Sequence, residues 1–335
     1  MVAIVQVKNL VKVYNGSVRA VDDISFEVNE GEIFGFLGPN GAGKTTTISM
    51  LTTLIKPTSG NAKVVGHDIV KEAHDVRNVI GLVPQDLTVD DDLTGRENMI
   101  LQGDLYKVPK EELIKRVEGL LDLVGLTDAE DRMVKTYSGG MRKRLELAEG
   151  LVHHPKVLFL DEPTLGLDVQ TRAAMWEHIM DLKKKHNTTI FLTTHYLEEA
   201  DSLCDRIAII DHGKIVALDS PRQLKASLGG DVIEVSVESE VDGSDSISGL
   251  EGVIEVQFSE GKYRIKVTSG ENVAPSVLKI LWDQGVAVKS VNISQPNLDQ
   301  VFMEYTGRSL RDAMQSSVQD RGQRMARAMQ SRRRR

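Results

Sequence analysis

The sequence contains little cysteine, few aromatic residues and no long apolar stretch. Its 335 residues include one cysteine, Cys204, and only 4% are aromatic. A single cysteine excludes an internal disulfide and fits a reducing compartment. Purely apolar runs such as 157–160 and 207–210 are far shorter than the ~20 residues that cross a bilayer. Polar and charged residues occur within the first ten positions, which is unlike a signal peptide. We therefore expect a cytoplasmic chain.

Charge is distributed unevenly along the chain. Forty-one Lys and Arg against 49 Asp and Glu give a net charge of −8. Residues 308–335 carry nine arginines and two aspartates, which leaves −15 on residues 1–307. An acidic body argues against nucleic acid as a partner, because phosphate backbones need a basic surface. We interpret 308–335 as a basic, disordered tail; the alternative is a contact with anionic lipid headgroups or acidic loops of a partner.

Changes in the hydrophobic pattern divide the chain into domains. Over residues 1–224, short β-rich runs alternate with helical patterns, which indicates an α/β domain with a largely parallel sheet. Strand signals stop at about 86–150, which predicts a helical subdomain. Alternating strands and short helical patterns over 225–307 predict a small α+β domain with an accessory or regulatory role.

Some segments predict individual elements. Residues 2–7 alternate apolar and polar side chains, as in a half-solvated edge strand, whereas 33–37 is almost wholly apolar, as in a strand buried on both faces. Residues 207–218 predict a hairpin that turns at 211–213. Residues 242–246 are polar and contain glycine, which favours a loop.

One segment matches the phosphate-binding pattern G-x-x-x-x-G-K-[ST]. Its glycines permit a loop whose N–H groups point at phosphate oxygens, Lys44 supplies charge for the β- and γ-phosphates, and the Thr45 hydroxyl is a Mg²⁺ ligand. An apolar strand precedes the loop and a helix follows, so the helix dipole faces the anion. The matching residues are Gly38, Pro39, Asn40, Gly41, Ala42, Gly43, Lys44 and Thr45.

A second motif is an apolar strand, 157–160, that ends in Asp161 and Glu162. Ligands in open α/β sheets bind beyond the carboxyl ends of the strands, where the phosphates would lie. Asp161 suits the Mg²⁺ shell, and Glu162 is placed to orient and deprotonate an attacking water. Alone, an Asp-Glu pair after a strand is more often a solvated turn; beside the phosphate loop it predicts catalysis.

A third motif, Ser138-Gly139-Gly140, opens an amphipathic stretch. A serine and two glycines at a helix start offer a hydroxyl and bare N–H groups to an anion. Taken singly the signal is weak, because a serine at this position is usually only a helix cap.

With Gln85 after Val83-Pro84, and His195 after Thr193-Thr194, these motifs make residues 4 to about 222 resemble the ATP-binding subunit of ABC transporters. The resemblance implies the cassette fold of P-loop NTPases, with a mixed-sheet core, and ATP and Mg²⁺ as ligands. It assigns adenine stacking to Tyr14, the phosphate loop to Gly38–Thr46, the lid to Gln85, the signature to Ser138–Met141, metal and catalytic acids to Asp161 and Glu162, the dimer-crossing loop to Leu165–Asp168, and γ-phosphate sensing to His195. Thr45, Gln85 and Asp161 would hold the metal.

The resemblance also implies partners. In this family two cassettes sandwich two ATP molecules, and one chain carries one full set of motifs, so a homodimer is implied. The membrane pore would be a separate permease, which would hold this chain on the inner face of the cell membrane. The signature has Met141 where glutamine is usual and Tyr137 where leucine is usual. That signature and residues 296–307 resemble the drug- and antibiotic-exporting branch of the daunorubicin-resistance type.

The predicted function is ATP hydrolysis that powers export of drugs, antibiotics or other hydrophobic compounds. One alternative is a soluble ABC-type ATPase acting on ribosomes or DNA; another is a motor for an ion, lipid or polysaccharide. A third is a nucleotide-binding regulator without turnover, against which Glu162 and His195 argue.

Other candidate residues are interpreted as structural. Cys204 lies before an apolar strand and is expected to pack rather than to react. His153 and His154 are adjacent, outside metal-ligand spacing, and are expected at a solvated helix end. Residues 90–92 are three aspartates, which favours a solvated turn; the alternative is a contact with basic loops of a membrane partner.

Overall fold

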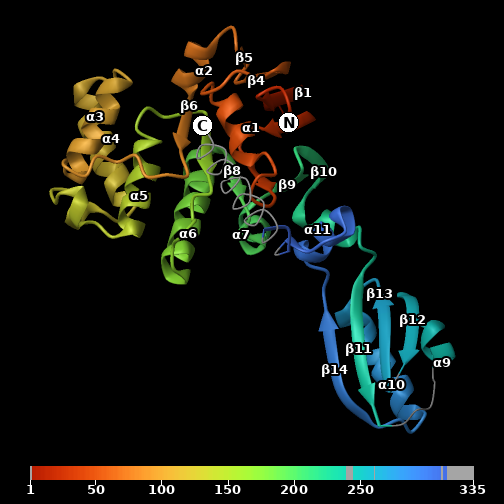
Figure 1. The fold of residues 1–335 in the computed structure, drawn as a ribbon. Coiled ribbons are helices and arrows are strands. Elements are labelled where there is room, and N and C mark those ends of the chain that lie inside the picture. Colours follow the sequence, from red (N-terminus) through yellow and green to blue (C-terminus); the bar gives the residue numbers. More distant parts are fainter. Residues whose placement is uncertain (1, 239–243, 260, 311, 315–335) are drawn as a thin grey trace, which may run out of the picture. The chain divides into compact units, whose positions relative to one another are not determined.

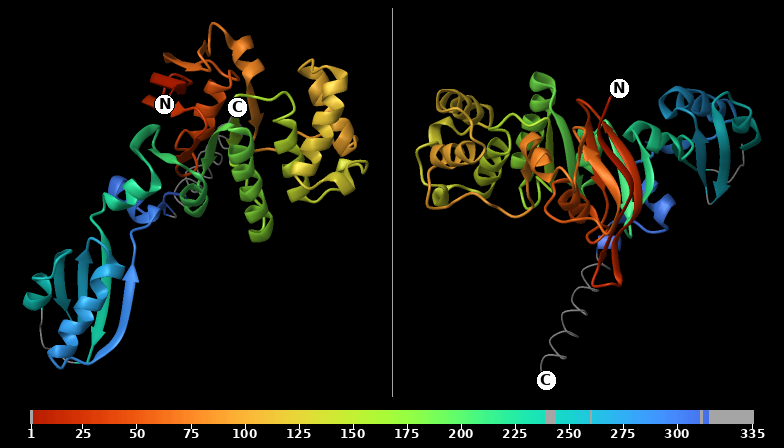
Figure 2. Two further views of the ribbon diagram at one scale, coloured as in Figure 1. Left: turned by 180° about the vertical axis from the view of Figure 1, so that it is seen from behind. Right: turned by 90° about the horizontal axis from the view of Figure 1, so that it is seen from above.

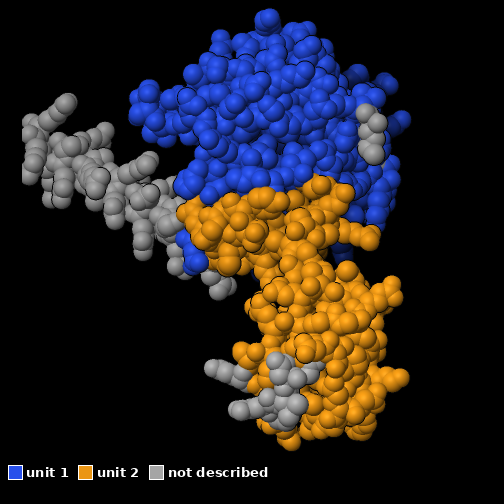
Figure 3. Space-filling view, turned by 90° about the vertical axis from the view of Figure 1, so that its right-hand side faces the viewer, with its two compact units in different colours: residues 1–218, 310–335 blue, residues 219–309 orange. Residues whose placement is uncertain are grey.

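The computed structural model describes residues 2–238, 244–259, 261–310 and 312–314 (Figure 1). The chain divides into two compact units (Figure 3): a first unit of residues 1–218 with 310–335, and a second unit of residues 219–309. Within the described ranges, no helix is both long enough and apolar enough to span a membrane.

The first unit contains two sheets. The antiparallel sheet has the order β2-β1-β4-β5, with strands Ala3–Tyr14 (β1), Val18–Asn29 (β2), Ser59–Val64 (β4) and His67–Asp68 (β5). The second sheet has the order β10-β9-β3-β8-β7-β6, and β9, β3, β8, β7 and β6 run parallel. Its strands are Ile33–Leu37 (β3), Ile80–Val83 (β6), Val157–Asp161 (β7), Thr189–Thr194 (β8), Arg206–Asp211 (β9) and Lys214–Asp219 (β10).

Strand β1 corrects the expectation of an edge strand at residues 2–7. It continues to Tyr14 and pairs antiparallel with β2 on one side and β4 on the other. Val5, Val7 and Leu10 are buried between the sheets. Apolar alternation reports which face of a strand is covered, and it says nothing about how many of its edges are paired.

Most of the phenylalanines lie between the two sheets. Phe26 of β2 stacks on Phe34 of β3, with ring centroids 5.4 Å apart. Phe36, Phe159 and Phe191 complete the cluster, which holds five of the chain's seven phenylalanines. Each is at most 6% exposed, so the cluster binds the antiparallel sheet to the parallel one through buried apolar area.

The helices of the first unit follow the predicted alternation. The predicted helical subdomain contains α3, α4 and α5, which lie together on one side of the sheets in both views of Figure 2. The bounds are Lys44–Leu51 (α1), Ala73–Val79 (α2), Gly95–Leu105 (α3), Lys110–Leu123 (α4), Gly139–Glu149 (α5), Val169–His186 (α6) and Leu197–Leu203 (α7). Two 3₁₀ turns, Thr127–Ala129 and Val134–Thr136, connect α4 to α5.

The predicted hairpin is confirmed as β9 and β10. His212 and Gly213 join the strands with φ of 46° and 80°. Two consecutive residues of positive φ form the tight turn that suits the twist of paired strands.

The second unit is α+β, as predicted. Its antiparallel sheet has the order β12-β13-β11-β14. Apolar residues of β11 and β13, such as Ile233 and Tyr263, form a buried core with α10 residues such as Val277. The elements are Pro221–Ala226 (α8), Asp231–Val237 (β11), Ser244–Ser248 (α9), Val253–Ser259 (β12), Lys262–Val267 (β13), Gly270–Asp283 (α10), Val288–Ser294 (β14) and Leu298–Thr306 (α11).

Two expectations for this half of the chain need correction. Of the loop expected at 242–246, residues 242–243 lie outside the described residues, and Ser244 begins α9, because Ile247 is buried in the core of the second unit. The tail expected from residue 308 begins with packed residues, since Leu310 and Ala313 are each 2% exposed. Residues 315–335 of that tail lie outside the described residues.

Candidate functional site

Four neighbouring parallel strands bring distant motifs to one edge of the sheet. In the order β3-β8-β7-β6, the phosphate loop follows β3, His195 follows β8, Asp161 ends β7 and Gln85 follows β6. Because parallel strands share the edge where their carboxyl ends meet, these residues lie close together although they are far apart in sequence.

The phosphate loop is held in a conformation that glycine alone adopts easily. Gly41 and Gly43 have φ of 86° and 113°. A Cβ on Gly43 would lie 2.5 Å from the Ala20 carbonyl oxygen, and one on Gly38 would lie 2.3 Å from the Ile210 carbonyl oxygen. Beside the loop is a cavity of about 280 Å³. It is lined by Ala20, Asn40, Gly41, Gly43, Lys44, Thr45, Thr46, Gln85, Glu162 and Leu165.

Lys44 is the buried cation of this cavity. Its side chain is 4% exposed, and Nζ donates to the carbonyl oxygens of Gly38 (2.7 Å) and Pro39 (3.2 Å). The same Nζ lies 3.1 Å from Oε1 of Glu162. The ammonium is therefore fixed over the loop, where it can attract a phosphate.

Asp161 is positioned by two threonine hydroxyls. Thr193 Oγ1 donates to Asp161 Oδ1 at 2.5 Å, and Thr45 Oγ1 lies 3.4 Å from the same oxygen. Burial raises the pKa of Asp161, and the hydrogen bonds from both threonines oppose that shift. A hydroxyl and a carboxylate oxygen side by side are the hard oxygen ligands that Mg²⁺ prefers.

Glu162 has a strained backbone and two positively charged or protonatable neighbours. Its φ is 50°, and its N–H donates to Thr193 Oγ1 at 3.0 Å. Its Oε2 accepts from Nδ1 of His195 at 3.0 Å. Burial tends to raise the pKa of Glu162, but the hydrogen bond with His195 and the charge of Lys44 outweigh burial and lower it. The carboxylate is therefore ionised at neutral pH.

Thr193 is a residue of this site that sequence reasoning missed. Its hydroxyl donates to Asp161 and accepts from the Glu162 N–H, so it links the two acids. The available signal was a threonine at the end of a buried strand next to His195, and only the pairing of β8 with β7 gives it a role.

The signature residues lie outside this cavity. Ser138 caps α5, and its Oγ accepts from the Met141 N–H at 3.2 Å. Ser138 and Gly139 are exposed, whereas a Cβ on Gly140 would lie 2.4 Å from Cγ2 of Thr171. The cavity is not lined by any of these residues in the part of the chain that is described.

Asp168 and Tyr14 also lie outside the cavity lining. Asp168 caps α6, where its carboxylate accepts from the Thr171 N–H (2.9 Å) and hydroxyl (2.7 Å). These hydrogen bonds lower the pKa of Asp168. Tyr14 is 38% exposed at the end of β1, and Lys12 Nζ lies 5.2 Å from its ring centroid. Dimer contact by Asp168 and adenine stacking by Tyr14 stay predictions.

The residues interpreted as structural are placed as follows. Cys204 is buried, and a Cβ on Gly35 would lie 2.5 Å from its Sγ, so the thiol packs against the glycine. His153 corrects the expectation of a solvated helix end. Its Nε2 is 2.7 Å from the Ile80 carbonyl oxygen, and its ring stacks on Tyr106 with the ring centroids 3.7 Å apart. Burial lowers the pKa of His153, and the hydrogen bond to Ile80 opposes that shift.

The aspartates at 90–92 contact basic residues of their own chain. Asp91 lies 3.3 Å from Arg142 Nη1, and Asp92 lies 3.6 Å from Lys135 Nζ. Both aspartates are more than half exposed, so these ion pairs are weak.

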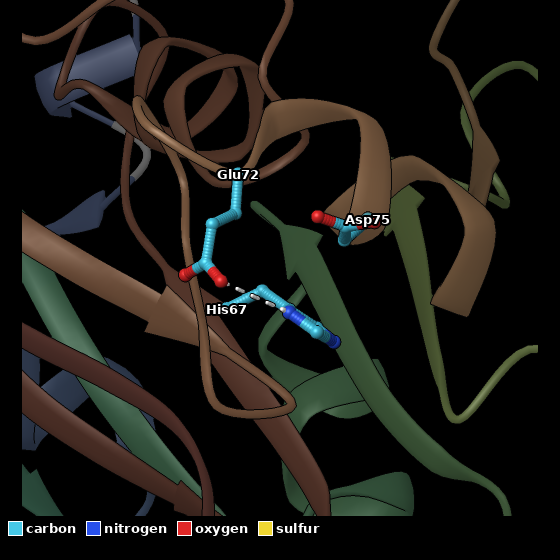
Figure 4. A group of neighbouring side chains, drawn as sticks. All are labelled: His67, Glu72 and Asp75. Atoms are coloured by element: carbon cyan, nitrogen blue, oxygen red, sulfur yellow. Dashed lines mark ion pairs between the residues drawn. The ribbon is translucent and has the colours of Figure 1, made fainter.

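A second group of side chains has ligand atoms close enough to hold a metal. His67, Glu72 and Asp75 each place one such atom within 4.8 Å of the others (Figure 4). Glu72 also accepts from the Asp68 N–H at 2.8 Å and lies 3.7 Å from His67. These contacts join β5 to the start of α2. Stabilisation of the loop between the two elements is therefore enough to explain why these side chains lie close together.

This site defines a P-loop nucleotide-binding ATPase cassette. A glycine-rich loop follows a buried strand, a buried lysine donates to the carbonyl oxygens of that loop, and two acids and a histidine lie at the ends of the adjacent strands. The comparisons agree. The ABC transporter family matches residues 21–165, and the C-terminal domain of DrrA1-3-like ATP-binding proteins matches residues 220–306.

The sequence matches to curated relatives cover about nine-tenths of this chain. The daunorubicin/doxorubicin resistance ATP-binding protein DrrA of Streptomyces peucetius is 42% identical over 306 residues, covering 90% of this chain and 92% of that protein. The linearmycin resistance ATP-binding protein LnrL of Bacillus subtilis is 38% identical over 314 residues, covering 92% of this chain and 99% of that protein. The ATP-binding cassette MJ0796, solved as a dimer bound to ADP and Pi, has a TM-score of 0.59 and 26% identity, covering 64% of this chain and 98% of that one.

The chain therefore belongs to the ABC transporter family, as an ATP-binding subunit whose activity is ATP hydrolysis coupled to transport.

Proposed function

We propose that this chain is the Mg²⁺-dependent ATPase of an exporter for drugs, antibiotics or other hydrophobic compounds. It works as a homodimer, bound through a separate permease to the inner face of the cell membrane. The names of the relatives from Streptomyces and Bacillus support this substrate class over a soluble ATPase acting on ribosomes or DNA. The observation that carries the catalytic assignment is that Glu162 lines the phosphate cavity and contacts both Lys44 and His195.

The oxygen ligands fit a Mg²⁺ ion. Thr45 and Asp161 place a hydroxyl and a carboxylate oxygen 3.4 Å apart, and Gln85 lines the phosphate cavity together with Thr45. These three residues would hold the metal. When bound, Mg²⁺ neutralises charge on the β- and γ-phosphate oxygens.

Lys44 links phosphate binding to the release of Glu162. Its ammonium has three donors, two of which are used by Gly38 and Pro39 and one of which faces Glu162. A γ-phosphate oxygen competes with the Glu162 carboxylate for that third donor. Once Lys44 holds the phosphate, the carboxylate is free to accept a proton from the attacking water, while His195 keeps it in place.

The location of the signature supports a second copy as partner. Ser138 and Gly139 are exposed at the N-terminus of α5, where a hydroxyl and the N–H groups of the first turn favour an anion. They are not among the residues that line the cavity of their own chain. In the homodimer each signature caps the nucleotide held by the other copy's phosphate loop. Hydrolysis then removes the shared charge and lets the copies separate.

Glu162→Gln tests this proposal. The amide keeps the shape of the side chain but cannot accept the proton, so we expect ATP binding to persist, turnover to fall by at least about a hundredfold, and an ATP-bound dimer to accumulate. Phosphate release and size-exclusion chromatography with light scattering measure the two effects. Turnover within a few-fold of wild type would refute the base assignment, and a monomer with ATP bound would refute the homodimer.

A further inference from the structure

The segment that follows Gln85 is fastened to α5 by two side chains. Lys143 Nζ donates to the carbonyl oxygens of Pro84 (2.6 Å) and Gln85 (3.4 Å). Glu146 Oε1 accepts from the N–H of Thr88 (2.5 Å) and from its hydroxyl (3.0 Å). Two residues of one helix thus hold both ends of this short segment.

The same two side chains form a buried ion pair. Lys143 Nζ lies 3.0 Å from Glu146 Oε2, and the side chains are 6% and 1% exposed. Among the described residues Oε2 has no hydrogen-bond partner, so the ammonium is what compensates its burial. A buried ion pair gives little net stability compared with apolar residues of the same shape, because both charges lose their hydration. We infer that the ion pair matters because it fixes the position of residues 84–88 relative to α5.

This pair connects the two parts of the proposed ATP machinery. Gln85 lines the phosphate cavity, and α5 begins with the exposed signature residues Ser138 and Gly139. The signature acts on the other copy's nucleotide, whereas Gln85 acts on the nucleotide of its own chain. Residues 84–88 and α5 are joined by charge-assisted hydrogen bonds, which are short and directional.

We propose that Lys143 and Glu146 are positioning residues that make Gln85 follow the signature helix. When Ser138 engages the second copy's nucleotide, the pair carries Gln85 to its working position, so that each site becomes competent only in the closed dimer. This inference rests on the proposed function. It adds a coupling between Gln85 at the phosphate cavity and the signature residues at the start of α5.

The test compares single and double replacements in the full-length chain. Lys143→Met and Glu146→Gln each leave one buried charge unpaired, so each should lower the Tm by several degrees. The double variant removes both charges, and its Tm should return close to wild type. Its kcat for ATP should still be about tenfold to a hundredfold below wild type, with KM within about threefold, because the side chain introduced by Lys143→Met cannot donate to the Pro84 and Gln85 carbonyl oxygens and Gln85 is no longer placed. Amide exchange of the peptide spanning 84–90 should accelerate.

The control is an exposed ion pair of the same kind. Lys185 Nζ lies 2.8 Å from Asp181 Oδ2 on α6, and both side chains are largely exposed. Lys185→Met with Asp181→Asn should change neither kcat nor exchange at 84–90.

Several outcomes would overturn the inference. A double variant with wild-type kcat would show that the pair serves the fold alone. Unchanged exchange at 84–90, or a rise in KM with kcat unchanged, would show that it does not place Gln85. If Glu162→Gln retains turnover, the proposed function fails; if Glu162→Gln is inactive while the double variant is fully active, the coupling alone fails.

Discussion

Glu162 and His195 contact each other directly, with Oε2 of the glutamate 3.0 Å from Nδ1 of the histidine. Both side chains are 6% exposed, so water does not screen the contact. The carboxylate can only accept a hydrogen bond, and therefore Nδ1 carries the proton and Nε2 is left for another partner. The histidine is thereby oriented by the residue that it assists.

Replacing His195 should change the pH dependence of turnover. The hydrogen bond from His195 lowers the pKa of Glu162, so His195→Ala should raise that pKa. Glu162 must be ionised to accept a proton, and the acid limb of kcat against pH should therefore move to higher pH, with kcat about a hundredfold lower. Steady-state ATPase rates between pH 5 and pH 8 measure both effects.

The exposed His212 offers a control, because His212→Asn keeps a residue that tolerates its positive φ. This variant should have the wild-type profile. A lower kcat in His195→Ala with an unmoved acid limb would mean that His195 does not set the pKa of Glu162.

Glu149 of α5 should make the protein less stable as the pH rises. Burial, and to a smaller extent the nearby Glu146, raises its pKa from 4.5 to about 8. Between these pH values the folded chain binds a proton that the unfolded chain has released, so the free energy of unfolding falls across this window. Glu149→Gln keeps the neutral form and should stabilise the chain by about 2 kcal/mol at pH 6 and about 5 kcal/mol at pH 8.5.

Chemical denaturation at the two pH values measures this gain. Glu111→Gln, at an exposed position in the first turn of α4, should give no such trend. A gain of equal size at both pH values would contradict the assigned pKa.

The signature glycine Gly140 should tolerate no side chain while Thr171 faces it. A Cβ would lie 2.4 Å from Thr171 Cγ2, so Gly140→Ala should cost about 1–3 kcal/mol through overpacking. Thr171→Ser removes that methyl group and keeps the hydroxyl bonded to Asp168, and adding it should restore most of the loss. Thermal unfolding of the single and double variants measures the effect.

Gly139→Ala is the matched control, since a Cβ there would have no described atom within 4 Å. It should leave the Tm close to wild type. A double variant as unstable as Gly140→Ala would show that the contact with Thr171 is not the cause.

The sequence was sufficient for features that depend on local pattern. The phosphate loop is recognisable because its glycines, lysine and threonine are consecutive, and the acids are recognisable because they end an apolar strand. The sequence was not sufficient to predict contacts between segments that are far apart along the chain. Neither Thr193 nor the pair Lys143 and Glu146 belongs to a motif that shows its partner, and their roles arise only when β8 lies beside β7 and α5 packs against the residues after β6.

The packing of Cys204 against Gly35 has a practical consequence. Burial raises the pKa of this thiol well above its usual range, so it stays protonated and reacts slowly with alkylating reagents. Because it is the chain's single cysteine, a new cysteine on an exposed residue would be the one sulfur that a maleimide dye or spin probe modifies. Such probes can follow the approach of two copies without the need to replace Cys204 first.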